Sequence, residues 1–152
     1  MEIKTFEDLI DWARQLHHHL SKCLGECSGQ NQDERARALL SYLADHEAEL
    51  ERITAEFEKQ GDPKALKTRL YDYLNHKPIE THRTCDSHYA DLDYQGIVTE
   101  IFDFHDQVIE LYDTLAGKAE IPEARALLES LRDMEQHEAM RLARQIGRME
   151  DI

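Results

Sequence analysis

Apolar residues recur three and four positions apart in four long segments of the 152-residue chain. The first segment begins near residue 5, and its stripe contains Phe6, Leu9, Ala13, Leu16, His17, Leu20 and Leu24. The polar stretch 28–33 ends it, and the later segments cover about 34–59, 96–116 and 122 to near the C-terminus. Stripes with this period indicate amphipathic helices that each bury one face.

Start signals support the same boundaries. Thr5 with Asp8 three residues later is a helix-capping pair, and Pro122 suits the first position of a helix. In the connection 62–95, Asp62 caps a short helix in "DPKALKTRLYDYL", and an irregular stretch follows. The predicted order is therefore helix, short loop, helix, long connection, helix, short loop, helix.

The two halves of the chain repeat each other at an offset of 88 residues. "ARALLSYLADHE" at 36–47 returns as "ARALLESLRDME" at 124–135, with eight of twelve positions identical. One hairpin cannot bury its apolar face alone, but two hairpins related by a pseudo-twofold axis can bury each other's. The sequence thus predicts an all-α four-helix bundle in one domain, with hairpins at about 5–60 and 96–150 joined by a long central connection.

In each half, a histidine and a glutamate are thirty residues apart: His17 with Glu47, and His105 with Glu135. Each pair is centred in or beside a short loop. Residues equidistant from a hairpin turn lie at about the same height, since a helix rises ~1.5 Å per residue. We therefore expect His17 to face Glu47 and His105 to face Glu135 inside the bundle. Glu138 lies on the apolar stripe of the fourth segment as well.

Carboxylates and imidazoles in a bundle core are costly unless they are paired. Two metal ions bridged by Glu47 and Glu135 would convert the buried charge into ligation. Two simpler roles remain open, namely neutral histidines hydrogen-bonded to carboxylates, and glutamates in salt bridges or at partly solvated positions. The predicted metal ligands are His17, Glu47, His105, Glu135 and Glu138, with His46 in reserve because it fits the same helix row as Glu47.

The chain resembles the ferritin-like superfamily, in particular its rubrerythrin-type domains, over nearly its full length apart from 62–95. The resemblance is carried by Tyr112, seven residues after His105, and by the leucines that precede each second-helix glutamate: Leu39, Leu40, Leu43, Leu127, Leu128 and Leu131. In that family each hairpin offers a Glu on its first helix and a Glu-x-x-His on its second, around a di-iron centre. The resemblance implies iron, bridging glutamates at Glu47 and Glu135, and a homodimer formed through helix faces; manganese or zinc also suits the residues.

The ligand positions depart from the family pattern. His17 and His105 stand where the family has first-helix glutamates, and the second-helix motif reads Glu47-x-x-Leu50 in one half and Glu135-x-x-Glu138 in the other. The second half therefore offers more ligands than the first, unless His46 turns inward. We expect a metal on the His105–Glu138 side to bind first, and the His17 side to be weak or empty.

Net charge and composition argue against some classes of binding partner. The net charge of −14 argues against nucleic acid and anionic membranes, and no apolar run approaches the ~20 residues of a membrane span. The N-terminus lacks a signal-peptide pattern, and three cysteines are an odd count. We therefore predict a cytoplasmic protein with reduced cysteines, in which Cys23 and Cys27 are partly buried thiols.

The central connection contains His76, His82, Cys85 and His88, whose spacing would suit zinc, although a simply polar loop is the favoured interpretation. No nucleophile motif or phosphate-binding loop is present, and neither is the Cys-x-x-Cys pattern of a rubredoxin module. Two function classes remain. One is a di-metal protein with oxidase, peroxidase or metal-handling activity, and the other is a non-enzymatic bundle with a degenerate metal site that acts as an interaction module.

Overall fold

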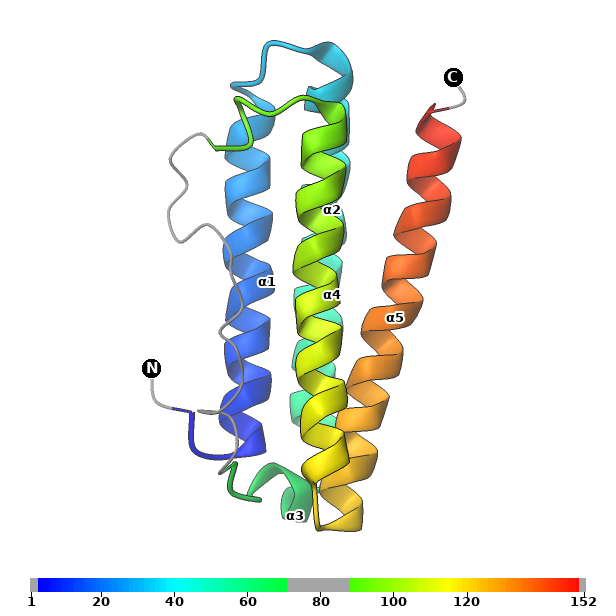
Figure 1. The fold of residues 1–152 in the computed structure, drawn as a ribbon. Coiled ribbons are helices and arrows are strands. Elements are labelled where there is room, and N and C mark those ends of the chain that lie inside the picture. The colour runs from blue at the N-terminus through cyan, green and yellow to red at the C-terminus, as the bar shows by residue number, and fades with distance from the viewer. Residues whose placement is uncertain (1–2, 71–87, 151–152) are drawn as a thin grey trace.

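The computed structural model describes residues 3–70 and 88–150. It contains four long helices and one short one, and an isolated bridge between Thr5 and Arg69 is the only β-type pairing in these ranges. Figure 1 shows the bundle that they form. The helices are α1 (Phe6–Ser28), α2 (Glu34–Gln60), α3 (Pro63–Leu66), α4 (Tyr94–Lys118) and α5 (Pro122–Glu150).

The helix starts follow the predicted caps. Thr5 and Asp8 form a capping box at α1, in which each side chain accepts a hydrogen bond from the other's backbone N–H. Aspartate side chains cap α2, α3 and α4 in the same position, at Asp33, Asp62 and Asp93. Asp93 places the start of α4 two residues before the predicted Gly96, and α3 is only four residues long.

The 88-residue repeat sets the register of the helices. Phe6 and Tyr94, the first residues of α1 and α4, are separated by this offset, and so are Glu34 and Pro122, which begin α2 and α5. α1 and α5 run one way while α2 and α4 run the other way (Figure 1). This up-down-down-up order, with two hairpins and a long crossover, is the predicted all-α ferritin-like arrangement.

The core is built from the predicted stripes. α1 packs along α2 and α4 packs along α5, while α2–α4 contacts and ring contacts between α1 and α4 join the hairpins. Leucines and isoleucines fill both ends of the bundle, among them the fully buried Leu9, Ile10, Leu24, Leu39, Leu40, Leu43, Leu50, Ile97, Ile101, Leu111 and Leu128. α5 leans away from the other helices toward its C-terminal end (Figure 1).

Two polar contacts tie the loops to the bundle. The Asn31 side chain, in the α1–α2 loop, donates to the carbonyls of Tyr89 and Leu92 at 3.1 Å each, just before α4 begins. Backbone bonds connect Phe6 with Thr68 at the other end. None of the described helices is both long and apolar enough to cross a lipid bilayer.

Candidate functional site

One side chain from each long helix contributes to a polar cluster in the centre of the bundle. His17 comes from α1, Glu47 from α2, His105 from α4 and Glu135 from α5, and all four are at most 1% exposed. Apolar stripes carry each of them inward, since each occupies a position where its helix faces the core. The structure thus brings together four of the six residues proposed as ligands from the sequence; we call them the His–Glu cluster.

Hydrogen bonds link the two hairpins through this cluster. His17 donates from Nδ1 to Glu47 Oε2 at 3.0 Å and from Nε2 to Glu135 Oε1 at 2.7 Å. His105 donates from Nε2 to Glu47 Oε1 at 2.8 Å. Both oxygens of Glu47 are therefore occupied, and each imidazole reaches a carboxylate of the opposite hairpin.

The charges in the cluster compensate one another. Burial lowers the pKa of His17, but the charges of Glu135 and Glu47 outweigh it and raise this pKa to about 10. Burial also opposes ionisation of Glu47, yet His105 and His17 hold the pKa of its carboxyl well below its usual range. The pKa of His105 is raised, because Glu47 overcomes the effect of burial. An ionised carboxylate only accepts hydrogen bonds, so His17 uses both nitrogens as donors and is an imidazolium.

The repeat predicts a His105–Glu135 hydrogen bond that would match the His17–Glu47 bond, but these two side chains do not form it. His17 and Glu47 are bonded within their hairpin, whereas Nδ1 of His105 and Oε2 of Glu135 are both buried without a hydrogen-bond partner in the described residues. The expected facing of His105 and Glu135 therefore does not produce a direct bond. An unpaired buried polar atom costs ~1–3 kcal/mol, so water or an ion is needed here.

Two further polar atoms lie unpaired on this side. The buried hydroxyl of Tyr112 has no partner in the described structure; burial raises its pKa, and the charge of Glu135 adds to the shift. Nε2 of His46 is also buried and unpaired. The His46 ring lies beside that of His105, with 5.9 Å between centroids, and burial lowers the pKa of His46.

Glu138 lies near these unpaired polar atoms, at the edge of the core. It is 9% exposed and accepts a bond from Arg141 at 3.2 Å. The equivalent position in the first hairpin is the fully buried Leu50. Tyr112 likewise has an apolar counterpart, Leu24, at the same offset. The second half of the repeat thus carries two polar side chains where the first half has leucines.

The two sides of the cluster differ in the donor atoms that they could offer to a metal ion. Both nitrogens of His17 are already bonded to carboxylates, and Leu50 offers no ligand, so the first-hairpin side does not fit a metal. The second-hairpin side has unpaired buried nitrogen and oxygen atoms, which are donor types that divalent transition metals bind. Across residues 3–70 and 88–150, no group of three His, Cys, Asp or Glu side chains is pre-arranged around a point that could hold a metal.

Only one of the sequence candidates in the central connection, His88, belongs to the described residues. His76, His82 and Cys85 fall outside the described residues, and His88 contacts Glu100 of α4 at 2.8 Å. Cys27 is a buried free thiol. Cys23 is disulfide-bonded, so the expectation of three reduced cysteines is wrong for this residue.

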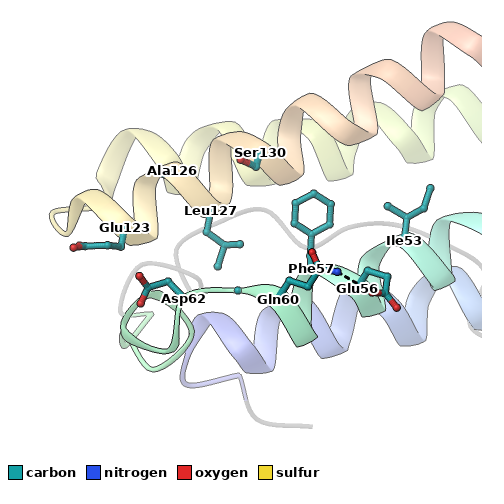
Figure 2. Close-up of a pocket in the computed structure, with 10 residues that line it drawn as sticks. Ile53, Glu56, Phe57, Gln60, Asp62, Glu123, Ala126, Leu127 and Ser130 are labelled. Carbon is teal, nitrogen blue, oxygen red and sulfur yellow. Dashed lines mark hydrogen bonds between the residues drawn. The ribbon is translucent and has the colours of Figure 1, made fainter.

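One cavity is separate from the His–Glu cluster. It has a volume of about 490 Å³ and lies between the C-terminal half of α2 and the N-terminal half of α5. Figure 2 shows Phe57 and Leu127 projecting between these helices. Charged residues in its lining are all acidic: Glu56, Asp62 and Glu123. We call it the acidic groove, and it contains no residue of the cluster.

Two features of the site were missed from the sequence. The Tyr112 hydroxyl is a buried polar atom beside Glu135, although Tyr112 was noted only as part of a family pattern. The sequence signal was the 88-residue offset, which pairs Tyr112 with Leu24 and shows that one half has a polar residue where the other has an apolar one. The bond from Arg141 to Glu138 was missed too, and the three-residue spacing on one helix would have indicated it.

Comparison with known proteins supports the fold. No protein-family model and no curated protein matches this sequence. Among solved structures, the chain is similar to a Thermotoga maritima protein described as a ferritin-like diiron-carboxylate protein, with a TM-score of 0.61 and 16% sequence identity. The match covers 95% of this chain and 96% of the other. The chain has the ferritin-like fold.

Proposed function

We propose that this protein binds one divalent transition-metal ion in the bundle core, on the side of the His–Glu cluster that belongs to the second hairpin. The ligands are His105, Glu135, Glu138 and His46. Iron is the metal suggested by the similar structure, which is described as a diiron-carboxylate protein. Manganese and zinc are alternatives that a mixed nitrogen and oxygen donor set also accepts.

One observation carries this proposal: the unpaired polar atoms at the His–Glu cluster lie on or beside His105 and Glu135, and none is on His17. Nε2 of His46, Nδ1 of His105 and Oε2 of Glu135 have no partner in the described structure, whereas the two nitrogens of His17 are both bonded. A bound cation would give the three donors a partner and offset the cost of burying them. Rotation of these side chains is required, because no pre-arranged group exists in the described ranges.

Metal binding is coupled to protons in this arrangement. The raised pKa of His105, which Glu47 maintains against burial, favours the protonated form of its imidazole. A metal ligand must be deprotonated, so binding at His105 releases a proton and is stronger at higher pH. The metal would supply Lewis acidity or redox chemistry, while Glu47 and His17 hold the two hairpins together around it.

The test is a titration of chelator-treated protein with Co(II), followed by visible absorption and by proton release in weak buffer. We expect one tight step near one equivalent, with net proton release. Glu138→Ala and His46→Ala should each weaken this step by about tenfold or more, as loss of even supporting groups at metal sites does. His18→Ala is the matched control, because His18 forms an exposed pair with Glu51 outside the cluster. Two equal steps, or unaffected binding in Glu138→Ala, would contradict the proposal.

A second candidate function follows from the bridging of His17. Its imidazolium bonds to both Glu47 and Glu135 and balances their negative charge without a metal ion. Such a cluster can serve only to stabilise the core. The protein would then be a non-enzymatic bundle that acts as an interaction module. This candidate predicts no Co(II) spectrum, no proton release, and no metal in protein purified without a tag.

A further inference from the structure

A second groove between α2 and α5 differs in charge from the acidic groove. It has a volume of about 330 Å³ and lies between the N-terminal half of α2 and the C-terminal half of α5. Here α5 leans away from the rest of the bundle (Figure 1). Its lining consists of Tyr42, Arg141, Arg144, Gln145 and Arg148. It therefore contains three guanidinium groups and no carboxylate, and we call it the arginine groove.

Helix geometry gathers the three arginines. Arg141, Arg144 and Arg148 follow one another at spacings of three and four, which place them on one face of α5. Like charges at these spacings repel, so their grouping needs a reason. Arg148 lies in the last turn, where a cation interacts favourably with the helix dipole. Arg144 and Arg141 lie too far from the end of α5 for that effect.

Internal partners do not neutralise the arginine groove. Arg141 donates to Glu138 at 3.2 Å, and within residues 3–70 and 88–150 Arg148 donates only to the neutral side chain of Gln145, at 3.1 Å. Arg144 has no ion-pair partner among the described residues. The whole chain carries 32 acidic and 18 basic residues, so its overall field repels anions. Three clustered arginines with a single acidic partner, Glu138, are therefore a local feature and not a consequence of composition.

We propose that the arginine groove binds a small oxyanion that carries more than one negative charge. Arginine presents its N–H groups as a planar fork that matches phosphate and carboxylate oxygens. The volume falls at the lower end of the ~300–1,000 Å³ typical of small-ligand pockets. Tyr42 adds an aromatic wall and a hydroxyl that can donate to the same anion. This site is separate from the proposed metal site and requires no metal.

The test uses the full-length, chelator-treated protein, so that a failure of the metal proposal does not affect it. Pyrophosphate is titrated by calorimetry at low salt, with citrate as the carboxylate arm. We expect saturable binding of one anion per chain. Tighter pyrophosphate binding identifies a phosphoryl ligand and tighter citrate binding a carboxylate ligand, and both support the site.

Two arginine variants locate the binding. Arg144→Gln removes a groove cation that holds no internal partner, and it should weaken the preferred anion by about tenfold, since hydrogen bonds to charged groups are strong. Arg125→Gln is the matched control: Arg125 lies on the same helix, is exposed, and pairs with Glu129 outside the groove. Unchanged affinity in Arg125→Gln and loss in Arg144→Gln would support the proposal.

Three results would overturn it. One is the absence of saturable binding at millimolar pyrophosphate and citrate. Another is an equal loss of affinity in Arg144→Gln and Arg125→Gln, which would indicate a general charge effect. The third is a dimer in sedimentation analysis that both Arg144→Gln and Glu123→Gln dissociate, because the arginine groove would then hold the acidic groove of a second copy.

Discussion

The two hairpins contribute the same pair of residues to the core but leave it in different states. In the first hairpin, His17 bonds to Glu47, and no polar nitrogen of His17 is left over. In the second, His105 and Glu135 each keep an unpaired buried atom. The repeat therefore produces a satisfied side and an unsatisfied side within one cluster.

Two positions within the repeat also differ in polarity between the two sides. Leu24 and Leu50 close the first side with apolar side chains, while their counterparts Tyr112 and Glu138 bring polar atoms to the second. A polar atom gained in a core must find a partner, because burial without one is costly. The comparison teaches that two halves of a sequence repeat can differ in how completely their buried polar atoms are paired.

The largest expected effect is a difference in stability between variants of Glu47 and Glu135. Glu47→Gln removes the carboxylate that accepts from both histidines, and should lower the free energy of unfolding by about 3–5 kcal/mol, as breaking a buried ion pair does. Glu135→Gln removes a single bond from His17 and should cost less. Urea unfolding of the two metal-free variants measures the difference. Equal losses would mean that the cluster is more symmetric than its hydrogen bonds indicate.

The pH dependence of stability is the next effect. The folded-state pKa of His17 is raised to about 10, so its contribution is complete below about pH 6.5 and is lost as the pH rises through 10. The loss amounts to at most about 1.4 kcal/mol per pH unit in this window. The pKa of Glu47 is lowered, so its contribution is present above about 4.5 and is lost as the pH falls toward the folded value.

Urea midpoints of the metal-free protein from pH 5 to pH 10 test this expectation. Stability should be greatest between about pH 5 and 6.5 and should decline toward higher pH. His17→Gln, which cannot carry a charge, should show a smaller decline. A midpoint that stays constant from pH 7 to pH 9 in the wild type would contradict an imidazolium at His17.

Much of the fold followed from the sequence. Each stripe identified a helix, and α5 begins at the predicted Pro122, whereas α4 begins two residues before the predicted Gly96. Equal height from the turn also placed His17 against Glu47. These inferences depend on helix period and rise, which vary little between proteins.

The hydrogen-bond pattern could not be predicted in the same way. His105 bonds to Glu47 of the other hairpin and not to Glu135, because rotamers and the approach of the hairpins decide which oxygen a ring nitrogen reaches. The arginine groove was not predicted either, because its residues occupy an exposed face of α5, outside the apolar stripes from which the helices and the site were inferred. The metal-ligand roles of all six candidates stay predictions.

A third prediction makes the first hairpin more like the second. Leu50→His places a polar ring at a fully buried position, and should destabilise the metal-free protein by about 1–3 kcal/mol. The new imidazole also supplies the ligand that the first side lacks. Co(II) should therefore recover part of this stability and show a second, weaker step. Leu43→His is the control: Leu43 is fully buried on α2, one turn from Glu47 and about two turns from Leu50, and this variant should lose stability without the second step.

The smallest expected effect concerns the edge of the proposed metal side, where Arg141 donates to Glu138 at 3.2 Å. This pair competes with a metal for the carboxylate, and Arg141 is 64% exposed, so the pair is worth only about 0.2–1 kcal/mol. Arg141→Gln should therefore raise Co(II) affinity by no more than about fivefold. Arg144→Gln makes the same change in charge on the same face without touching Glu138, and should raise it less. If both variants raise the Co(II) affinity equally, the change in net charge is the cause. If only Arg141→Gln raises it, the cause is the release of the Glu138 carboxylate. An oxyanion that draws Arg141 into the arginine groove would then release the same carboxylate and strengthen metal binding.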